Sequence, residues 1–393
     1  MNFALLGDDP GLLPIVRAIS ESPDDRLSSA ALCGELQETL MTEIPGLRFG
    51  KTWDELLADL SLDVVLIGGN GEDVLEGARR LAGEGTSLLV VPRTSLDATF
   101  AYEMSLIRDD SHVVLMPAFL WRFDGAIGQF QTSLQENDVG KLLHLQLERH
   151  VSTVASNRLS PEEIDNSLLN DCELLRCLGG NYSQVTALRS SGADETISMQ
   201  TVTLAGNQLP EATWIARPGA WDRWKLTAST ERGTLELSLE ADEAVLERIV
   251  DARTTALPLE PRDDACERLL ETLKSAVAGK STRPNWHDLT RAFEIVEAAH
   301  RSIRRRRTID LHFETTSERT QFKTQMTALG CGVLSYLFFG LIAYLLVGEL
   351  LDVGERTMKM LRIVWFAPVI VYLALQFLLV LARPASQQDT SDS

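Results

Sequence analysis

Cysteines and basic residues are scarce in this sequence, and each shortage excludes a class of protein. The 393 residues include only 5 Cys, and no two of them form a Cys-x-x-Cys pair. We therefore expect neither a disulfide framework nor a zinc knuckle, and a reducing, cytosol-facing compartment is favoured. Lys and Arg number 37 against 56 Asp and Glu, which gives a net charge of −19. So acidic a chain lacks the basic face that nucleic-acid binding requires.

The motifs of several common enzyme classes are also absent. The sequence contains no His-Glu-x-x-His and no Gly-x-Ser-x-Gly, and its 6 His lie in no cluster with carboxylates. A catalytic metal and a hydrolase-type nucleophile are therefore not expected. The segment Gly50-Lys51-Thr52 imitates a phosphate loop, but Pro45 stands where that loop needs Gly. We expect no nucleoside triphosphate site there.

Two long apolar runs stand out near the C-terminal end. Residues 327–347 and 363–382 carry no charged side chain, and each is long enough to cross about 30 Å of hydrocarbon as a helix. Basic residues that flank the pair outnumber those in the loop between the runs by five to three, which favours a cytoplasmic soluble part and C-terminus. The five are Arg306, Arg307, Arg319, Lys323 and Arg383. The sequence thus predicts an integral membrane protein anchored in the lipid bilayer by two spans.

The first 120 residues alternate between apolar runs of strand length and amphipathic segments of helix length. This predicts a parallel sheet covered on both faces, with a ligand beyond the carboxyl ends of its strands. Its strands are predicted at 3–6, 28–33, 63–67, 87–91 and 112–116. After residue 125, strand-like runs joined by short turns predict an α+β domain with an open, mostly antiparallel sheet and helices packed on it. Its strands are predicted at 142–147, 196–204, 211–216, 225–228 and 234–239, and its helices at 162–178, 263–278 and 288–303.

The turn after the first predicted strand reads Gly7-Asp8-Asp9-Pro10-Gly11-Leu12. A dinucleotide fingerprint requires Gly at positions 7, 9 and 12, and only Gly7 meets it. Asp9 followed by Pro is typical of a helix N-cap, which places a carboxylate where a pyrophosphate would bind. Two interpretations stay open: an internally capped helix with a damaged cofactor site, or a tolerated variant of the fingerprint. Glu35, after the second strand, either holds a ribose hydroxyl or is a surface residue.

Six further stretches carry a resemblance to a known family through their order and spacing. They are DVVLIGGN at 63–70, SLLVVPRTSL at 87–96, HVVLMPAFLWRFDGAIGQF at 112–130, LLNDCELLRCLGG at 168–180, TASTERGTLELS at 227–238 and AFEIVEAAHRSIRRRRTIDL at 292–311. With these the chain resembles the Gfo/Idh/MocA oxidoreductases, relatives of glucose–fructose oxidoreductase and inositol dehydrogenase, over nearly all of residues 3–313. The resemblance implies hydride transfer between NAD or NADP and a sugar or cyclitol alcohol.

The resemblance also implies a set of site residues. Those expected at the cofactor are Gly7, Asp8, Asp9, Gly11, Glu35, Gly69 and Asn70, and those expected at the substrate are Arg93, Arg122, Asn170 and Glu173. The family carries a signature Lys where this chain has Arg93, and a His where it has Asn170. An Asn amide cannot accept the proton of an alcohol, whereas Glu173 can if burial raises its pKa. Arg93 can orient a ligand but cannot shuttle protons.

The resemblance divides the chain into a Rossmann-like domain at 1–122 and an α+β substrate and oligomerisation domain at 123–315. A juxtamembrane linker, a transmembrane hairpin and a disordered tail are predicted at 316–326, 327–382 and 383–393. Two functions stay open. One is a membrane-anchored, NAD(P)-dependent oxidoreductase that acts on a sugar-like molecule, and the other is a non-catalytic binding, scaffolding or sensing module at the membrane surface. The altered residues favour the second, and analogy with the family implies a homo-oligomer.

Overall fold

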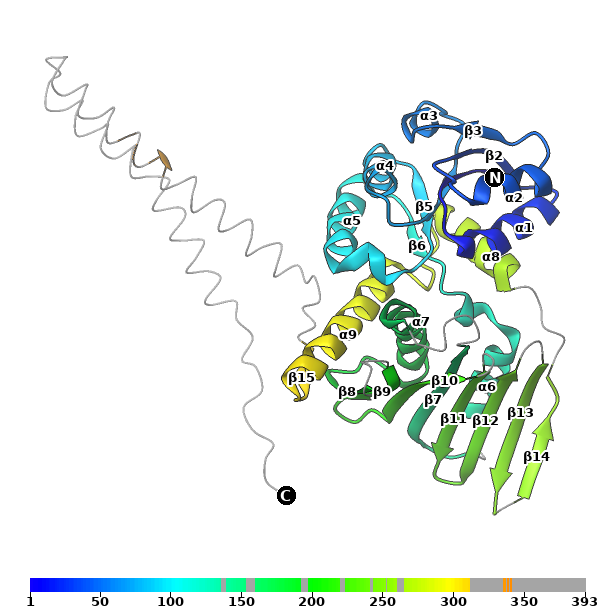
Figure 1. The fold of residues 1–393 in the computed structure, drawn as a ribbon, viewed down its shortest axis with the longest axis vertical. Coiled ribbons are helices and arrows are strands. Elements are labelled where there is room, and N and C mark those ends of the chain that lie inside the picture. The colour runs from blue at the N-terminus through cyan, green and yellow to red at the C-terminus, as the bar shows by residue number, and fades with distance from the viewer. Residues whose placement is uncertain are drawn as a thin grey trace, which may run out of the picture. The chain divides into compact units, whose positions relative to one another are not determined.

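The computed structural model describes most of the chain up to residue 311. The described ranges are 1–135, 139–152, 160–191, 197–219, 223–240, 243–251, 253–259 and 265–311, with residues 335, 336, 338 and 340 beyond them. The chain divides into two compact units, and the first of them, Met1–His312, contains two sheets with their helices (Figure 1).

The first sheet is parallel and has six strands in the order β3-β2-β1-β4-β5-β6. The strands are β1 (Asn2–Gly7), β2 (Arg26–Ala31), β3 (Arg48–Gly50), β4 (Val64–Gly68), β5 (Ser87–Val90) and β6 (Leu115–Pro117). All of β4 is buried, as expected for a central strand covered on both faces. The associated helices are α1 (Leu13–Glu21), α2 (Leu36–Glu43), α3 (Asp54–Leu57), α4 (Glu72–Gly83) and α5 (Asp97–Ser111). The predicted Rossmann-like parallel sheet is confirmed.

The second sheet has nine strands in the order β14-β13-β12-β11-β7-β10-β9-β8-β15. They are β7 (Leu142–Ser152), β8 (Gln184–Ser191), β9 (Ile197–Ala205), β10 (Glu211–Gly219), β11 (Arg223–Thr230), β12 (Gly233–Glu240), β13 (Glu243–Val250), β14 (Arg253–Leu257) and β15 (Ile309–Asp310). Every neighbouring pair is antiparallel except β7 with β10, so the predicted pairing is confirmed. Burial alternates along β11, because helices cover one face of the sheet only. Helices α6 (Gly125–Gln135), α7 (Pro161–Gly179) and α9 (Trp286–Arg305) pack against its strands.

Helix α8 (Ala265–Val277) packs with the first sheet, although it follows β14 of the second sheet in sequence. Its residues Leu269 and Leu273 are buried in one apolar cluster with Leu5 of β1 and Ile15 of α1. Figure 1 shows α8 next to α1. The helix predicted at 263–278 is therefore present, but it does not lie on the second sheet as expected.

Several elements fall outside the predicted set because their sequences lack a strong pattern. Strand β3 has only three residues, and β14 is polar and exposed. Helix α6 begins at Gly125 and contains a second Gly, which weakens its helical propensity. His112 adopts a left-handed conformation with φ of 57° and ends α5, so β6 begins at Leu115 instead of at His112.

The predicted integral membrane localisation is wrong for the part of the chain that the structure describes. Among the described residues, no helix is long and apolar enough to cross a bilayer. The segments 327–347 and 363–382 lie almost entirely outside the described residues, as do the predicted linker and tail. The predicted anchor and its bilayer partner therefore have no support in the structure.

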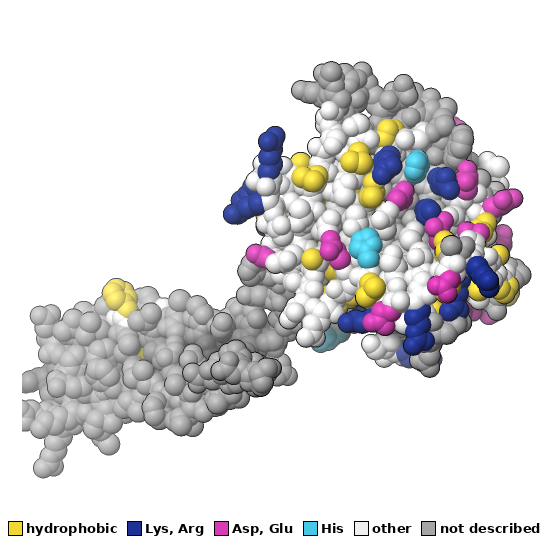
Figure 2. All heavy atoms as spheres, turned by 90° about the horizontal axis from the view of Figure 1, so that it is seen from below, with side chains coloured by type: hydrophobic (Ala, Val, Ile, Leu, Met, Phe, Trp, Pro, Cys, Tyr) yellow, Lys and Arg dark blue, Asp and Glu magenta, His cyan; other side chains and the backbone are white. Residues whose placement is uncertain are grey.

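Figure 2 shows one face of the described residues, on which basic and acidic side chains are mixed and hydrophobic ones are scattered among them. Isolated exposed hydrophobic residues are normal on the surface of a monomer. This face therefore gives no argument for or against the homo-oligomer, which stays a prediction.

Replacing Gly7 with Ala is expected to lower the free energy of unfolding by about 3 kcal/mol or more. Gly7 has a φ of 112°, and an added Cβ would lie 1.8 Å from the carbonyl oxygen of Gly68 on β4. Urea denaturation measures the loss. Gly83→Ala is the control, because a Cβ there meets nothing within 4 Å. Equal stability of the two variants would contradict the close approach of β1 and β4.

Candidate functional site

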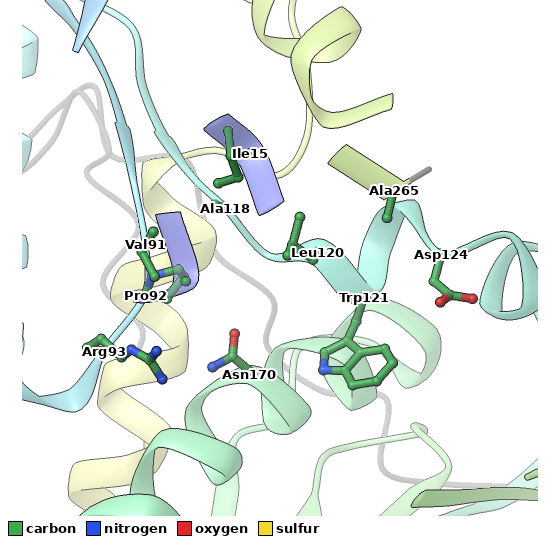
Figure 3. Close-up of a pocket in the computed structure, with 11 residues that line it drawn as sticks. Ile15, Val91, Pro92, Arg93, Ala118, Leu120, Trp121, Asp124, Asn170 and Ala265 are labelled. Atoms are coloured by element: carbon green, nitrogen blue, oxygen red, sulfur yellow. The ribbon is translucent and has the colours of Figure 1, made fainter. Parts of the chain in front are cut away.

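A pocket of about 670 Å³ opens near the carboxyl ends of β5 and β6, where parallel α/β sheets place their ligands. Gly11 and Arg93, which follow β1 and β5, line one part of it. Trp121 and Asp124, which follow β6, line another, and Asn170 of α7 lies between them (Figure 3). The pocket is therefore built by residues from both halves of the chain.

Asp9 and Arg93 form an ion pair beside this pocket. Arg93 donates from Nε to Asp9 Oδ2 at 2.7 Å and from Nη2 to Asp9 Oδ1 at 2.8 Å. Asp9 Oδ1 also accepts the amide of Gly11 at 2.7 Å, which makes Asp9 the N-cap of the 3₁₀ helix η1 (Pro10–Leu12). The side chain of Asp9 is only 9% exposed. The predicted N-cap is confirmed, and its pairing with Arg93 is an additional finding.

The ion pair keeps both of its members charged. Burial alone would raise the pKa of the Asp9 carboxyl, but the hydrogen bonds from Arg93 and Gly11 and the charge of Arg93 outweigh it, so the pKa is lowered. The hydrogen bond to Asp9 raises the pKa of Arg93 in turn. Among the described residues that line the pocket, Arg93 is the only basic one. Asp9 therefore compensates the positive charge that the pocket would otherwise offer.

Asp8 adds a second carboxylate at this edge of the sheet. A Cβ added at Gly34, after β2, would lie 2.8 Å from Asp8 Oδ2, and one added at Gly69, after β4, would lie 2.9 Å from Oδ1. The carboxylate therefore lies between the ends of these two strands. Glu35 and Asn70 follow the two glycines and are exposed. The structure thus gathers the residues expected at the cofactor near one edge, but two of them are acidic side chains at its centre.

The resemblance to the Gfo/Idh/MocA oxidoreductases implies a nicotinamide dinucleotide, and the residues after β1 do not fit its diphosphate. Sites of this kind bind the diphosphate through free backbone amides at a helix N-terminus. Here the Gly11 amide is already bonded to Asp9, and the carboxylates of Asp8 and Asp9 would face a dianion at close range. Gly7, with a φ of 112°, keeps the tight turn of the fingerprint. The turn is therefore preserved. The Gly11 amide is not available to a diphosphate, and the carboxylates of Asp8 and Asp9 make its surroundings negative.

Asn170 stands where the resemblance expects a proton-transferring His. Its Nδ2 donates to the backbone oxygen of Asn166 at 2.9 Å. Asn166 Oδ1 accepts the amide of Thr94 at 2.8 Å and its hydroxyl at 2.9 Å. These bonds join α7 to the loop that carries Arg93. Because an amide cannot take up a proton from an alcohol near neutral pH, Asn170 offers recognition but no general base.

Glu173 lies in a buried ion cluster and does not line the pocket. Arg122, in the 3₁₀ helix η3 (Leu120–Phe123), donates from Nε to Glu173 Oε1 at 2.8 Å. Arg176 donates to the same oxygen at 3.2 Å and also bonds Asp288 of α9. The side chains of Glu173 and Asp288 are both 1% exposed. A carboxylate held by two guanidinium groups supports the packing of α7, and its position does not favour proton transfer to a ligand.

Trp121 is a pocket residue that the sequence analysis missed. Its ring stacks on Trp224 of β11, with ring centroids 5.1 Å apart and an interplanar angle of 8°. The guanidinium carbon of Arg149 lies 5.8 Å from the centroid of Trp121. The indole is therefore fixed in place by residues of the second sheet. Its position directly before Arg122 was visible in the sequence, but the distant stacking partner was not.

No protein-family model and no curated protein matches the sequence, whereas solved structures match its fold. A candidate NADPH-dependent oxidoreductase from Desulfitobacterium hafniense has a TM-score of 0.71 at 15% identity, covering 79% of this chain and 97% of its own. An oxidoreductase from Agrobacterium radiobacter in complex with NAD⁺, L-tartaric acid and magnesium has a TM-score of 0.67 at 15% identity, covering 79% and 98%. A myo-inositol dehydrogenase from Corynebacterium glutamicum has a TM-score of 0.64 at 18% identity, covering 80% and 99%.

These similarities show that the chain has the fold of NAD(P)-dependent oxidoreductases such as inositol dehydrogenase. The resemblance to the Gfo/Idh/MocA oxidoreductases is thereby confirmed for the fold. At identities of 15% to 18%, the similarity does not extend to an activity. The residues of the site must decide the function.

Replacing Glu173 with Gln is expected to lower the free energy of unfolding by about 3 kcal/mol, because it leaves buried guanidinium charge uncompensated. Urea denaturation measures the change. Glu43→Gln is the matched control, since Glu43 pairs with Arg17 at the surface and its loss is expected to have little effect. If both variants lost the same small amount of stability, the buried cluster would not support the fold.

The ion pair of Asp9 also predicts a pH dependence. Its folded-state pKa lies below the unfolded value of 3.8, so its contribution to stability is full above about pH 5 and is lost as the pH falls through the folded-state pKa. In Asp9→Asn, the free energy of unfolding should therefore decline less between about pH 5 and pH 2 than in the wild type. Denaturation curves at a series of pH values test this, and parallel declines would contradict it.

Proposed function

We propose that this protein binds a small molecule in the pocket between its two sheets and does not transfer hydride. The observation that carries the proposal is the ion pair of Asp9 with Arg93 at the carboxyl end of β1. It places a buried negative charge, bonded to the Gly11 amide, where the diphosphate of a dinucleotide would bind. A dinucleotide would have to displace Asp9 from both partners before it could bind.

The acid–base groups around the pocket support the same proposal. Asn170 carries an amide where a proton acceptor is needed, and Glu173 is held in the buried ion cluster. The carboxylate that does line the pocket, Asp124, accepts the amide of Ala126 at 2.9 Å at the start of α6. The two positions that the resemblance assigns to proton transfer, Asn170 and Glu173, therefore supply no general base to an alcohol bound here.

The pocket itself supports a binding function. Its volume of about 670 Å³ lies within the range of sites for small molecules and cofactors. Bonds between Asn166 and Thr94 fix the position of its walls relative to one another. A preformed concave site of this size can bind a small molecule even where the residues for hydride transfer are missing.

The alternative is an NAD(P)-dependent oxidoreductase, and the fold together with Gly7 favours it. The A. radiobacter structure with this fold contains NAD⁺. For that activity, the loop of Asp9 would have to move so that the Gly11 amide and Arg93 become available. Measurement of cofactor binding separates the two functions.

The full chain is expected to show no saturable binding of NADH or NADPH by nicotinamide fluorescence at concentrations up to about 1 mM. Asp9→Gly should bind at least about tenfold more tightly than the wild type, because it removes a facing charge and frees the Gly11 amide and Arg93. Asp24→Gly removes the same charge from a remote exposed turn and is the control. Micromolar binding by the wild type would overturn the proposal and leave the oxidoreductase in place.

A further inference from the structure

The pocket between the two sheets has an apolar wall and one polar edge. Most of its lining is formed by hydrophobic side chains, namely Ile15, Val91, Pro92, Ala118, Leu120 and Ala265. A molecule with hydroxyl groups on every side would leave several of them without hydrogen-bond partners against this wall, which opposes binding. The wall instead favours a ligand that is apolar except along one side.

Asn170 stands at the polar edge with its amide in a fixed orientation. Because Nδ2 donates to the backbone oxygen of Asn166, the remaining polar atom, Oδ1, is presented to the pocket. Figure 3 shows this oxygen pointing toward the space next to Ala118 and Leu120. The pocket therefore offers a hydrogen-bond acceptor at the middle of its polar edge.

Two N–H donors stand on either side of this acceptor. Arg93 uses Nε and Nη2 in its two bonds to Asp9, and its Nη1 takes part in neither of them. Trp121 carries its indole nitrogen on the side of the ring that faces Asn170 (Figure 3). Its stacking on Trp224 holds the ring in that orientation. The polar edge therefore presents a donor from Arg93, an acceptor from Asn170 and a donor from Trp121, in that order (Figure 3).

The charges around the edge favour a neutral ligand. Asp9 already compensates Arg93 through two hydrogen bonds. An ion of either sign would lose its hydration against the mostly apolar wall, where charge is poorly solvated.

We propose that the pocket binds a neutral ring-shaped molecule with an imide edge, in which an N–H donor stands between two carbonyl acceptors. This inference rests on the proposed binding function and names the ligand class for the same site. The imide N–H donates to Asn170 Oδ1, and the two carbonyls accept from Arg93 and Trp121. The remainder of the ring lies against the apolar wall.

The test is calorimetric titration of the full chain with three probes: 2-phenylsuccinimide, its N-methyl derivative and myo-inositol. The free imide should bind, and N-methylation should weaken it by about tenfold or more, since the methyl group removes the donor to Asn170 and leaves that acceptor buried. Tighter binding of myo-inositol than of the imide would overturn the ligand class. Equal binding of the two succinimides, or binding of neither, would overturn it as well.

Asn170→Ala should abolish the difference between the two succinimides, and the control variant Asn207→Ala, at an exposed turn, should preserve it. Thermal unfolding shows whether both variants are folded. A difference that persists in folded Asn170→Ala would contradict the role of the amide oxygen. Titration with NADH in the same series tests the binding function separately, because cofactor binding overturns that proposal whatever the succinimides do.

Discussion

The ion pair between Asp9 and Arg93 determines what the carboxyl edge of the parallel sheet can bind. It connects the turn after β1 to the loop after β5, and both of its carboxylate oxygens are used within the protein. The helix N-terminus thereby receives a permanent internal anion, and Arg93 enters the pocket with its charge already compensated. The misfit of a diphosphate follows from this pairing, and so does part of the argument for the neutral ligand that we propose.

A second group of charged residues also forms structural contacts where the resemblance implies catalysis. By resemblance, Arg122 and Glu173 belong to a catalytic centre, yet they form a buried cluster with Arg176 and Asp288 that joins η3, α7 and α9. Buried clusters of this kind are costly to desolvate, and the removal of one partner leaves a buried charge uncompensated. Here the cluster fixes the position of α7 and therefore the position of Asn170 on it.

The sequence predicted those features that depend on neighbours along the chain. The N-cap at Asp9 follows from a carboxylate before Pro, and the parallel sheet follows from strands such as β4 that are apolar throughout. It did not predict that Arg93 pairs with Asp9, nor that Trp121 stacks on Trp224, because both contacts join segments far apart in sequence. The polar edge strand β14 of the second sheet was missed for a related reason, since its pairing with β13 and not its own residues makes it a strand.

The placement of α8 has a consequence for how the chain can be divided. This helix follows β14 of the second sheet in sequence, yet its leucines fill the core beside α1 and β1. A fragment that ended after β6 would lack α8 and would expose that part of the core to water. A fragment that began after β6 would contain α8 without the core against which its apolar face packs. The core of the first sheet therefore depends on a segment that follows most of the second sheet, so neither part can be replaced alone without loss of buried apolar contacts.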